Sequence, residues 1–121
     1  MSGAAGLVAE RDGARVFLPH GAVRALVRMP KIEPLPRAPR GVLGFALALG
    51  EVMLVVSVGS ARTDLVVCDW FGEALGLAGL VPVRAGTFDE APGGILFEDR
   101  LTPTFDLDEV GQLLLRTGSA A

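Results

Sequence analysis

The chain contains one histidine and one cysteine, the side chains that most often supply acid–base or nucleophilic chemistry near neutral pH. His20 stands in a Pro-His-Gly turn, and a catalytic triad around it would need a Gly-x-Ser-x-Gly elbow, which the sequence lacks. Cys68 stands in the apolar run Val-Val-Cys-Asp-Trp, with no neighbouring cation that would lower the pKa of its thiol. We therefore expect a surface histidine, a buried structural thiol and no catalytic residue.

The residue types of the chain disfavour a metal site and a phosphate-binding site. A structural zinc site needs about four Cys, His or carboxylate ligands, and the chain offers one Cys and one His. No Gly-x-Gly-x-x-Gly or Walker sequence is present to hold a phosphate. Asp106, Asp108 and Glu109 could hold a cation or act as an acid–base pair. The solvated start of a helix explains them with no further assumption and is the favoured reading, because carboxylates favour the positive end of its dipole. The expectation is a protein that is not an enzyme, with no metal and no cofactor.

Composition narrows the class of protein. Half of the 121 residues are hydrophobic, and 16 glycines with 8 prolines indicate many turns rather than disorder. We expect a single domain over 1–121, with flexible tails at 1–5 and 117–121. The net charge of −3 and the scattered basic residues disfavour nucleic-acid binding, which depends on clustered Lys and Arg. A lone cysteine fits a reducing compartment, and the first residues lack the regions of a signal peptide. These features predict a cytoplasmic protein.

One apolar run, residues 41–59, is long enough to cross a bilayer as a helix. Glu51 would lie near the middle of such a helix, where a carboxylate costs about 2.5–3.5 kcal/mol. Glycines within the run weaken a helix, and Val52–Val56 prefers a strand. We therefore predict no membrane insertion and a β-hairpin that pairs Val42–Leu47 with Val52–Val58.

The segments before this hairpin are short. Gly6–Arg11 and Ala14–Leu18 flank Asp12-Gly13, a pair suited to a two-residue type I′ turn, so they are predicted to form a hairpin. In the next segment, Ala22–Met29, apolar residues recur at i, i+3 and i+4, which predicts a short helix. Pro30 ends that helix.

The rest of the chain reads mainly as strands and turns. In chain order we expect an extended Ile32–Leu35, a strand Leu65–Phe71, a turn at Gly72-Glu73, a returning strand Ala74–Val83, a loop over Ala85–Gly94, a hairpin of Ile95–Phe97 with Leu101–Phe105, and a helix that Asp106 caps and that runs through Val110, Leu113 and Leu114. Many short strands with two short helices indicate a compact, barrel-like, mainly all-β domain.

Three segments follow one another in an order shared with a known family. The first hairpin ends at Leu18-Pro19 and is followed by a short segment that carries Val23. Two prolines then lead into Gly41-Val42-Leu43-Gly44, and strand-forming residues over Gly94–Asp108 close the chain. This order resembles the CheW-like chemotaxis coupling domain, an adaptor fold with no catalytic site, over nearly the whole chain. The resemblance is to a divergent and shortened form of that domain.

The resemblance implies a fold and two partners. The fold would be two interlaced small SH3-like β-barrels, with a short helix after the first hairpin and a C-terminal helix. A groove shared by the barrels would receive the tip of a chemoreceptor helical hairpin, and another face would bind the regulatory domain of a chemotaxis histidine kinase. Val23 and Gly44 match family positions at the receptor groove, and Leu49 occupies the position of a lost arginine. The implied location is a cytoplasmic chemoreceptor array.

Charged residues of the family are missing at three positions. Ala25 stands where the family has a glutamate, Leu49 where it has an arginine, and Ser57 where it has an aspartate. Charged groups of this kind orient polar interfaces, whereas an apolar groove depends on them less. We therefore expect receptor binding to persist and kinase binding to be weak or lost.

Two alternatives remain open. Leu47 and Leu49, on a hairpin of a small domain, would suit a homotypic assembly module. The cleft between the barrels could instead bind a small molecule, although the sequence offers no cluster of polar groups for it. Trp70 is read equally well as a core residue and as an interface residue.

Overall fold

The computed structural model describes residues 3–119 of the chain, without the side chains of residues 113 and 115–119. The tails predicted at 1–5 and 117–121 therefore lie partly outside the described residues. Where the structure describes the first of them, it shows a strand. Gly3, Ala4 and Ala5 pair with Asp89, Phe88 and Thr87.

Eleven strands, one 3-10 helix and one α-helix make up the described chain. In order they are β1 (Gly3–Arg11), β2 (Ala14–Pro19), η1 (His20–Ala22), β3 (Val23–Arg28), β4 (Ile32–Glu33), β5 (Val42–Ala48), β6 (Glu51–Ser57), β7 (Asp64–Trp70), β8 (Glu73–Ala78), β9 (Leu80–Ala91), β10 (Gly94–Phe97), β11 (Arg100–Pro103) and α1 (Leu107–Ser119). The all-β class that the sequence predicts is confirmed.

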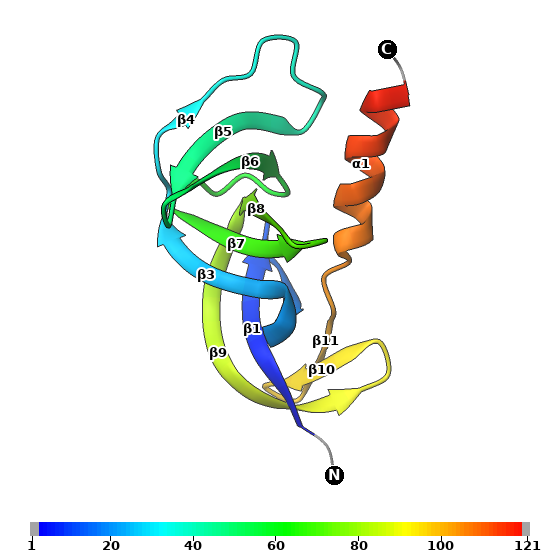
Figure 1. Cartoon of the computed structure of the whole chain (residues 1–121). Helices are drawn as coiled ribbons and strands as arrows, with labels where there is room; N and C mark the ends of the chain where they lie inside the picture. The colour runs from blue at the N-terminus through cyan, green and yellow to red at the C-terminus, as the bar shows by residue number, and fades with distance from the viewer. Residues whose placement is uncertain (1–2, 120–121) are drawn as a thin grey trace.

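The strands form two sheets that share the chain in an interlaced way (Figure 1). Sheet A has the order β11-β10-β9-β1-β2 and so joins the first and last strands of the chain. Sheet B has the order β3-β7-β8-β6-β5-β4 and is built from the middle of the chain. One pair, β6 with β8, is parallel, and the other pairings between named strands are antiparallel.

Sheet A curls until its two outer strands nearly meet. Phe17 of β2 forms a parallel bridge with Thr104, just beyond β11. The backbone N–H of Phe105 donates to the carbonyl oxygen of Phe17 at 2.7 Å. These contacts close sheet A into a small barrel at one end of the junction between β2 and β11.

Three apolar cores stabilise the two sheets. One is made of sheet B residues such as Met53, Leu65 and Val67, and another of sheet A residues such as Val8 and Phe17. The third lies between the sheets and α1, and combines residues of all three. Its buried members are Leu7, Ala9, Leu18, Val42, Val56, Val58, Val66, Cys68, Leu75, Leu77, Leu80, Phe105 and Val110. Because β7 faces a core on each side, it reads as a continuous apolar run rather than as an alternating one.

The helix predicted over Ala22–Met29 is wrong for most of its length. Only His20–Ala22 is helical, as a single 3-10 turn, and Val23–Arg28 is strand β3. The same residues also satisfy a period of two, with Val23, Ala25 and Val27 half-buried and the residues between them exposed. The segment forms a strand rather than a helix because its backbone pairs with β7.

The returning strand predicted over Ala74–Val83 is two strands that belong to different sheets. The chain turns at Gly79, whose φ of +118° is a conformation that side chains rarely adopt. A Cβ atom at Gly79 would overlap the backbone of Gly59, so the close approach of two chain segments also requires glycine. Here the chain passes from β8 in sheet B to β9 in sheet A.

The loop predicted over Ala85–Gly94 is also wrong, since β9 continues to Ala91. Most side chains from Val81 to Glu90 are exposed, so the segment shows no apolar alternation. Its backbone pairs with β1 along nearly the whole length of that strand, and this long-range pairing maintains the strand.

The predicted turn at Asp12-Gly13 is confirmed, with both residues at positive φ, as a type I′ turn requires. The same conformation occurs at Leu49-Gly50 and at Phe71-Gly72. In both of those hairpins glycine is the second central residue, and the turn predicted at Gly72-Glu73 therefore begins one residue earlier, at Phe71.

The predicted start of the C-terminal helix is confirmed. A carboxylate oxygen of Asp106 accepts a hydrogen bond from the backbone N–H of Asp108 at 2.9 Å, which satisfies one free donor of the first turn. Val110 and Leu114 pack against the core between the sheets, as predicted. The side chain of Leu113 lies outside the described residues.

Candidate functional site

A groove with a volume of about 420 Å³ lies between the two sheets. We call it the inter-sheet groove. Strands β1 and β9 of sheet A form one wall, and β3 of sheet B with η1 forms the other. Figure 1 shows β3 crossing beside β1 and β9. Its lining residues are Ala5, Gly6, Leu7, His20, Val23, Arg24, Ala25, Leu26, Ala85, Gly86 and Thr87.

The walls of the groove follow from strand alternation and from one close approach. On β3, Val23 and Ala25 are half-buried, and the Leu26 side chain is 44% exposed. On β1, a Cβ atom at Gly6 would overlap the carbonyl oxygen of Leu18 and lie 2.7 Å from the Phe17 ring. The floor of the groove is therefore backbone packed on backbone, and its walls are mainly apolar.

Val23, the first of the predicted receptor-binding residues, lines this groove. It lies opposite Cys68 in the pairing of β3 with β7 and packs against the core between the sheets. Its role in binding stays a prediction.

Gly44, the second, is buried on β5. Its φ is +145°, and a Cβ atom there would overlap the carbonyl oxygen of Glu33 on β4. Glycine at this position is therefore explained by the packing of β4 on β5, and a large side chain would disturb the sheet. A substitution such as Gly44→Arg would for this reason report on folding and not on receptor binding.

Leu49, the third, lies in the turn between β5 and β6 with a φ of +54°, and its side chain is 56% exposed. Three strands, β7, β8 and β6, separate β3 from β5 in sheet B. Of the three predicted residues, only Val23 lines the inter-sheet groove.

Arg24 links the edge of the groove to the rest of sheet B. Its guanidinium donates to Asp69 at 2.5 Å and 3.2 Å and to the carbonyl oxygen of Gly72 at 2.9 Å. It also lies 3.4 Å from the Glu51 carboxylate. The hydrogen bonds from Arg24 hold the pKa of Asp69 below its ordinary value. This network ties the turn after β7 and the start of β6 to the first residues of β3.

The two side chains with potential for chemistry, His20 and Cys68, lie in different surroundings. His20 is exposed at the groove mouth, as predicted for a surface turn. Cys68 is fully buried, and burial raises the pKa of its thiol to about 12, so the expected structural thiol is confirmed. Among residues 3–119, no three His, Cys, Asp or Glu side chains come together to hold a metal ion.

An apolar surface covers the β5–β6 hairpin. Leu47 is 66% exposed and Val52, its cross-strand partner, is 72% exposed, with Leu49 at the tip. Phe45 adds a partly exposed ring on the same hairpin. The sequence pointed to Leu47 and Leu49 but missed Val52, which reads as a core residue in an apolar run.

Trp70 is half-buried and packs on the core between the sheets, while its neighbour Phe71 is exposed in the following turn. The two rings meet edge to face, with centroids 5.2 Å apart. The packing agrees with the core reading of Trp70, and a role at an interface stays a prediction.

No helix in the described part of the chain is long and apolar enough to cross a membrane.

Two interlaced sheets with a groove between them define an all-β fold of the two-barrel class. Among solved structures the chain is similar to the crystal structure of the scaffolding protein TtCheW from Thermoanaerobacter tengcongensis. The TM-score is 0.66, and the match covers 88% of this chain and 90% of that chain at 14% sequence identity. No family model and no curated protein matches the sequence. The similarity shows a CheW-like fold.

Proposed function

We propose that the chain is a non-enzymatic adaptor of a bacterial chemosensory array, cytoplasmic, and that it binds a chemoreceptor tip in the inter-sheet groove. The observation that carries the proposal is the apolar groove between the sheets, with Val23 in its wall, in a fold similar to that of a scaffolding protein. The family-like order of motifs along the sequence supports the same reading. The whole chain acts as one domain in this proposal.

An amphipathic helix suits such a groove. Helices recognised in this way bury anchors spaced at i, i+3, i+4 and i+7 against an apolar surface. Val23, Ala25 and Leu26 offer that surface on one side, and the small residues Ala85 and Gly86 let a helix approach on the other. The guanidinium of Arg24 already donates hydrogen bonds to Asp69 and Gly72. Arg24 therefore forms the edge of the groove and is not expected to bind the helix through its charge.

The test uses a purified cytoplasmic fragment of a chemoreceptor and two matched variants. Leu26→Glu puts a charge on a groove side chain that is 44% exposed, and Leu96→Glu does the same on a strand side chain that is 42% exposed outside the groove. We expect Leu26→Glu to weaken binding at least tenfold, because a desolvated charge lacks a partner there. Leu96→Glu should bind like the parent protein. Equal binding by both variants would contradict the proposed groove.

The proposal includes weak or absent binding to the chemotaxis histidine kinase. Ala25 lines the groove, and Leu49 lies on an exposed turn, so neither can supply the charge found in the family. The Ser57 hydroxyl donates to the carbonyl oxygen of Gly59 at 3.1 Å and accepts from Arg62 at 2.9 Å. The hydrogen bonds of Ser57 therefore stabilise the connection that follows β6.

Purified components test the kinase part of the proposal. We expect no micromolar binding to the regulatory domain of the kinase by the parent protein. The double variant Leu49→Arg with Ala25→Glu should gain measurable affinity. Micromolar binding by the parent, or no gain by a folded double variant, would show that these positions do not decide kinase binding.

Self-association is a second candidate function, favoured by the exposed apolar surface of the β5–β6 hairpin. Sedimentation over a range of concentrations decides it. If the hairpin drives assembly, Leu47→Glu will make the protein monomeric. A monomeric parent protein would remove this alternative. Binding of a small molecule in the groove has less support, because His20 and Thr87 are the main polar side chains there that form no ion pair with the residues described.

A further inference from the structure

The junction of β2 and β11 in sheet A is closed at one end and open at the other. Both strands are outer strands of the sheet, and they run parallel where Phe17 bridges Thr104. Two residues back along each strand, Arg15 and Thr102 line an opening of about 690 Å³. We call this opening the seam. Gly13, Arg100 and Leu101 continue its two walls, and Glu10 and Glu98 complete them.

Both walls of the seam present backbone groups without a strand partner. β2 pairs with β1, and β11 pairs with β10, so each strand has one free edge. In a strand with one neighbour, about half of the backbone N–H and C=O groups point away from that neighbour. Such an edge can accept an extended segment as an added strand. The seam places two free edges on either side of one space.

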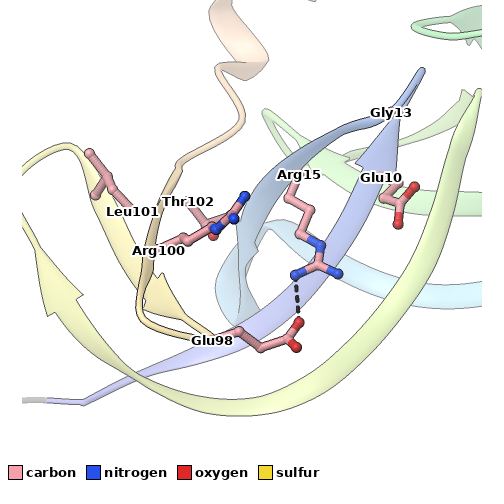
Figure 2. A pocket seen from close by; sticks show the side chains of 7 residues that line it. All are labelled: Glu10, Gly13, Arg15, Glu98, Arg100, Leu101 and Thr102. Atoms are coloured by element: carbon pink, nitrogen blue, oxygen red, sulfur yellow. Dashed lines mark hydrogen bonds and ion pairs between the residues drawn. The ribbon is translucent and has the colours of Figure 1, made fainter.

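Of the four charged side chains in the seam, two form an ion pair with each other and two do not. Arg15 donates to Glu98 at 2.5 Å, and its guanidinium lies 4.9 Å from the centroid of the Phe97 ring, so this pair is held in place. Arg100 and Glu10 make no ion pair or side-chain hydrogen bond with the described residues. Figure 2 shows Arg100 on one side of Arg15 and Glu10 on the other. Among the residues that the structure describes, the seam therefore offers one cation, Arg100, and one anion, Glu10, without an ion-pair partner.

We propose that the seam binds an extended segment of a partner protein as an added strand, with an acidic side chain against Arg100 and a basic one against Glu10. The two free edges would supply backbone hydrogen bonds, and the free charges would select the sequence and its direction. A second copy of this chain fits poorly, because Arg100 and Pro103 on β11 oppose edge-to-edge pairing with another β11. The proposal is independent of the inter-sheet groove.

The experiment pans a phage-displayed library of random dodecapeptides on the full chain and measures each enriched peptide by fluorescence anisotropy. The test variant is Arg100→Glu. The matched control is Arg84→Glu, which reverses another exposed arginine that has no ion pair with the described residues and lies outside the seam. We expect Arg100→Glu to weaken binding at least tenfold and Arg84→Glu to leave it unchanged. Exchanging the acidic residue of the peptide for lysine should restore binding to Arg100→Glu.

Two further measurements separate the seam from other sites. N-methylation of alternate peptide amides should abolish binding for one set of positions, as an added strand requires. Leu26→Glu in the inter-sheet groove should leave peptide binding unchanged, so failure of the adaptor proposal would not affect this result. The proposal is overturned if no peptide is enriched, if Arg100→Glu binds as the parent does, or if Leu26→Glu alone abolishes binding. A concentration-dependent dimer that Arg100→Glu dissociates would assign the seam to a second copy and would also overturn it.

Discussion

The inter-sheet groove and the seam are both built at strand edges, yet their side chains suit different ligands. The groove borders β3, one of the two outer strands of sheet B, and is lined mainly by apolar and small residues. The seam lies between β2 and β11, the outer strands of sheet A, and carries two arginines and two glutamates. In the groove, a strand at the edge of a sheet borders an apolar surface. In the seam, the backbone groups at the strand edges themselves are available to a ligand.

This contrast separates two ways to recognise a partner. In the groove, affinity would come from buried apolar area, which depends little on salt. In the seam, it would come from backbone hydrogen bonds and from charges near the surface, which salt screens over about 8 Å at physiological ionic strength. A protein with both sites would be able to hold two partners at once, because the lining residues of the two sites do not overlap.

The largest effect that distinguishes the two regions concerns their glycines. A Cβ atom at Gly6, on the groove floor, would overlap the carbonyl oxygen of Leu18, whereas nothing lies within 4 Å of a Cβ atom at Gly13, beside the seam. Gly6→Ala should therefore lower the free energy of unfolding by about 3 kcal/mol, because strand β1 must shift. Gly13→Ala should cost about 1 kcal/mol, from its φ of +89° alone. Urea unfolding measures both, and equal costs would contradict the close packing of the groove floor.

A second prediction concerns the residue behind the groove. Cys68 is fully buried opposite Val23, and burial raises the pKa of its thiol to about 12. In the folded protein at pH 8 the thiol should therefore react with a disulfide reagent only at the rate of unfolding. Cys68→Ser should cost about 1–3 kcal/mol, because a hydroxyl replaces a thiol among apolar side chains. Rapid labelling of the folded protein would mean that β3 opens readily from β7.

The parts of the fold that sequence predicts well are those decided locally. Asp12-Gly13 determines a type I′ turn through the conformations of its own two residues, so the first hairpin is confirmed. The helix after Asp106 is confirmed because its cap is formed within two residues. Neither feature needs information from the distant chain.

The groove walls, by contrast, are the parts that sequence reasoning missed. β3 and the second half of β9 were predicted as a helix and a loop, since β3 also fits a helical period and β9 shows no apolar alternation. Both are strands because they pair with β7 and β1, which are far away in the sequence. Val23 was identified through its place in a motif order, but that order carries no information on exposure. It therefore also selected the buried Gly44.

The seam gave no signal in the sequence. Its residues come from two segments about 85 positions apart, Glu10–Arg15 and Glu98–Thr102, which only the closure of sheet A brings together. Arg15 and Glu98 read separately as ordinary surface charges. A pattern of this kind becomes visible once strand order is known.

The smallest predicted effects concern the pKa of one carboxyl group near each region, Asp69 near the groove and Asp12 near the seam. Arg24, at the groove, lowers the pKa of Asp69, and the hydroxyl and backbone N–H of Ser60 lower the pKa of Asp12, next to Gly13 at the seam. For a carboxyl group whose pKa is lower in the folded protein, the stabilisation is complete above the unfolded pKa, ordinarily 3.8 for Asp, and is lost as pH falls through the folded pKa. Both pairs should therefore contribute at pH 6 and progressively less below about pH 4.

Two substitutions should separate these contributions. Arg24→Ala removes the main donor to Asp69 and leaves the weaker hydrogen bond from the backbone of Gly72, so the pKa of Asp69 should rise toward its ordinary value. Stability should then depend less on pH between 5 and 3. Ser60→Ala removes only the hydroxyl, while the backbone N–H remains 2.9 Å from Asp12, so the pKa of Asp12 should rise by less. Carbon-13 NMR titration of the carboxyl groups measures both values, and urea unfolding between pH 3 and 6 measures their consequence. If the pKa of Asp69 stays low in Arg24→Ala, another donor holds this carboxylate, and the groove edge is fixed by something other than Arg24.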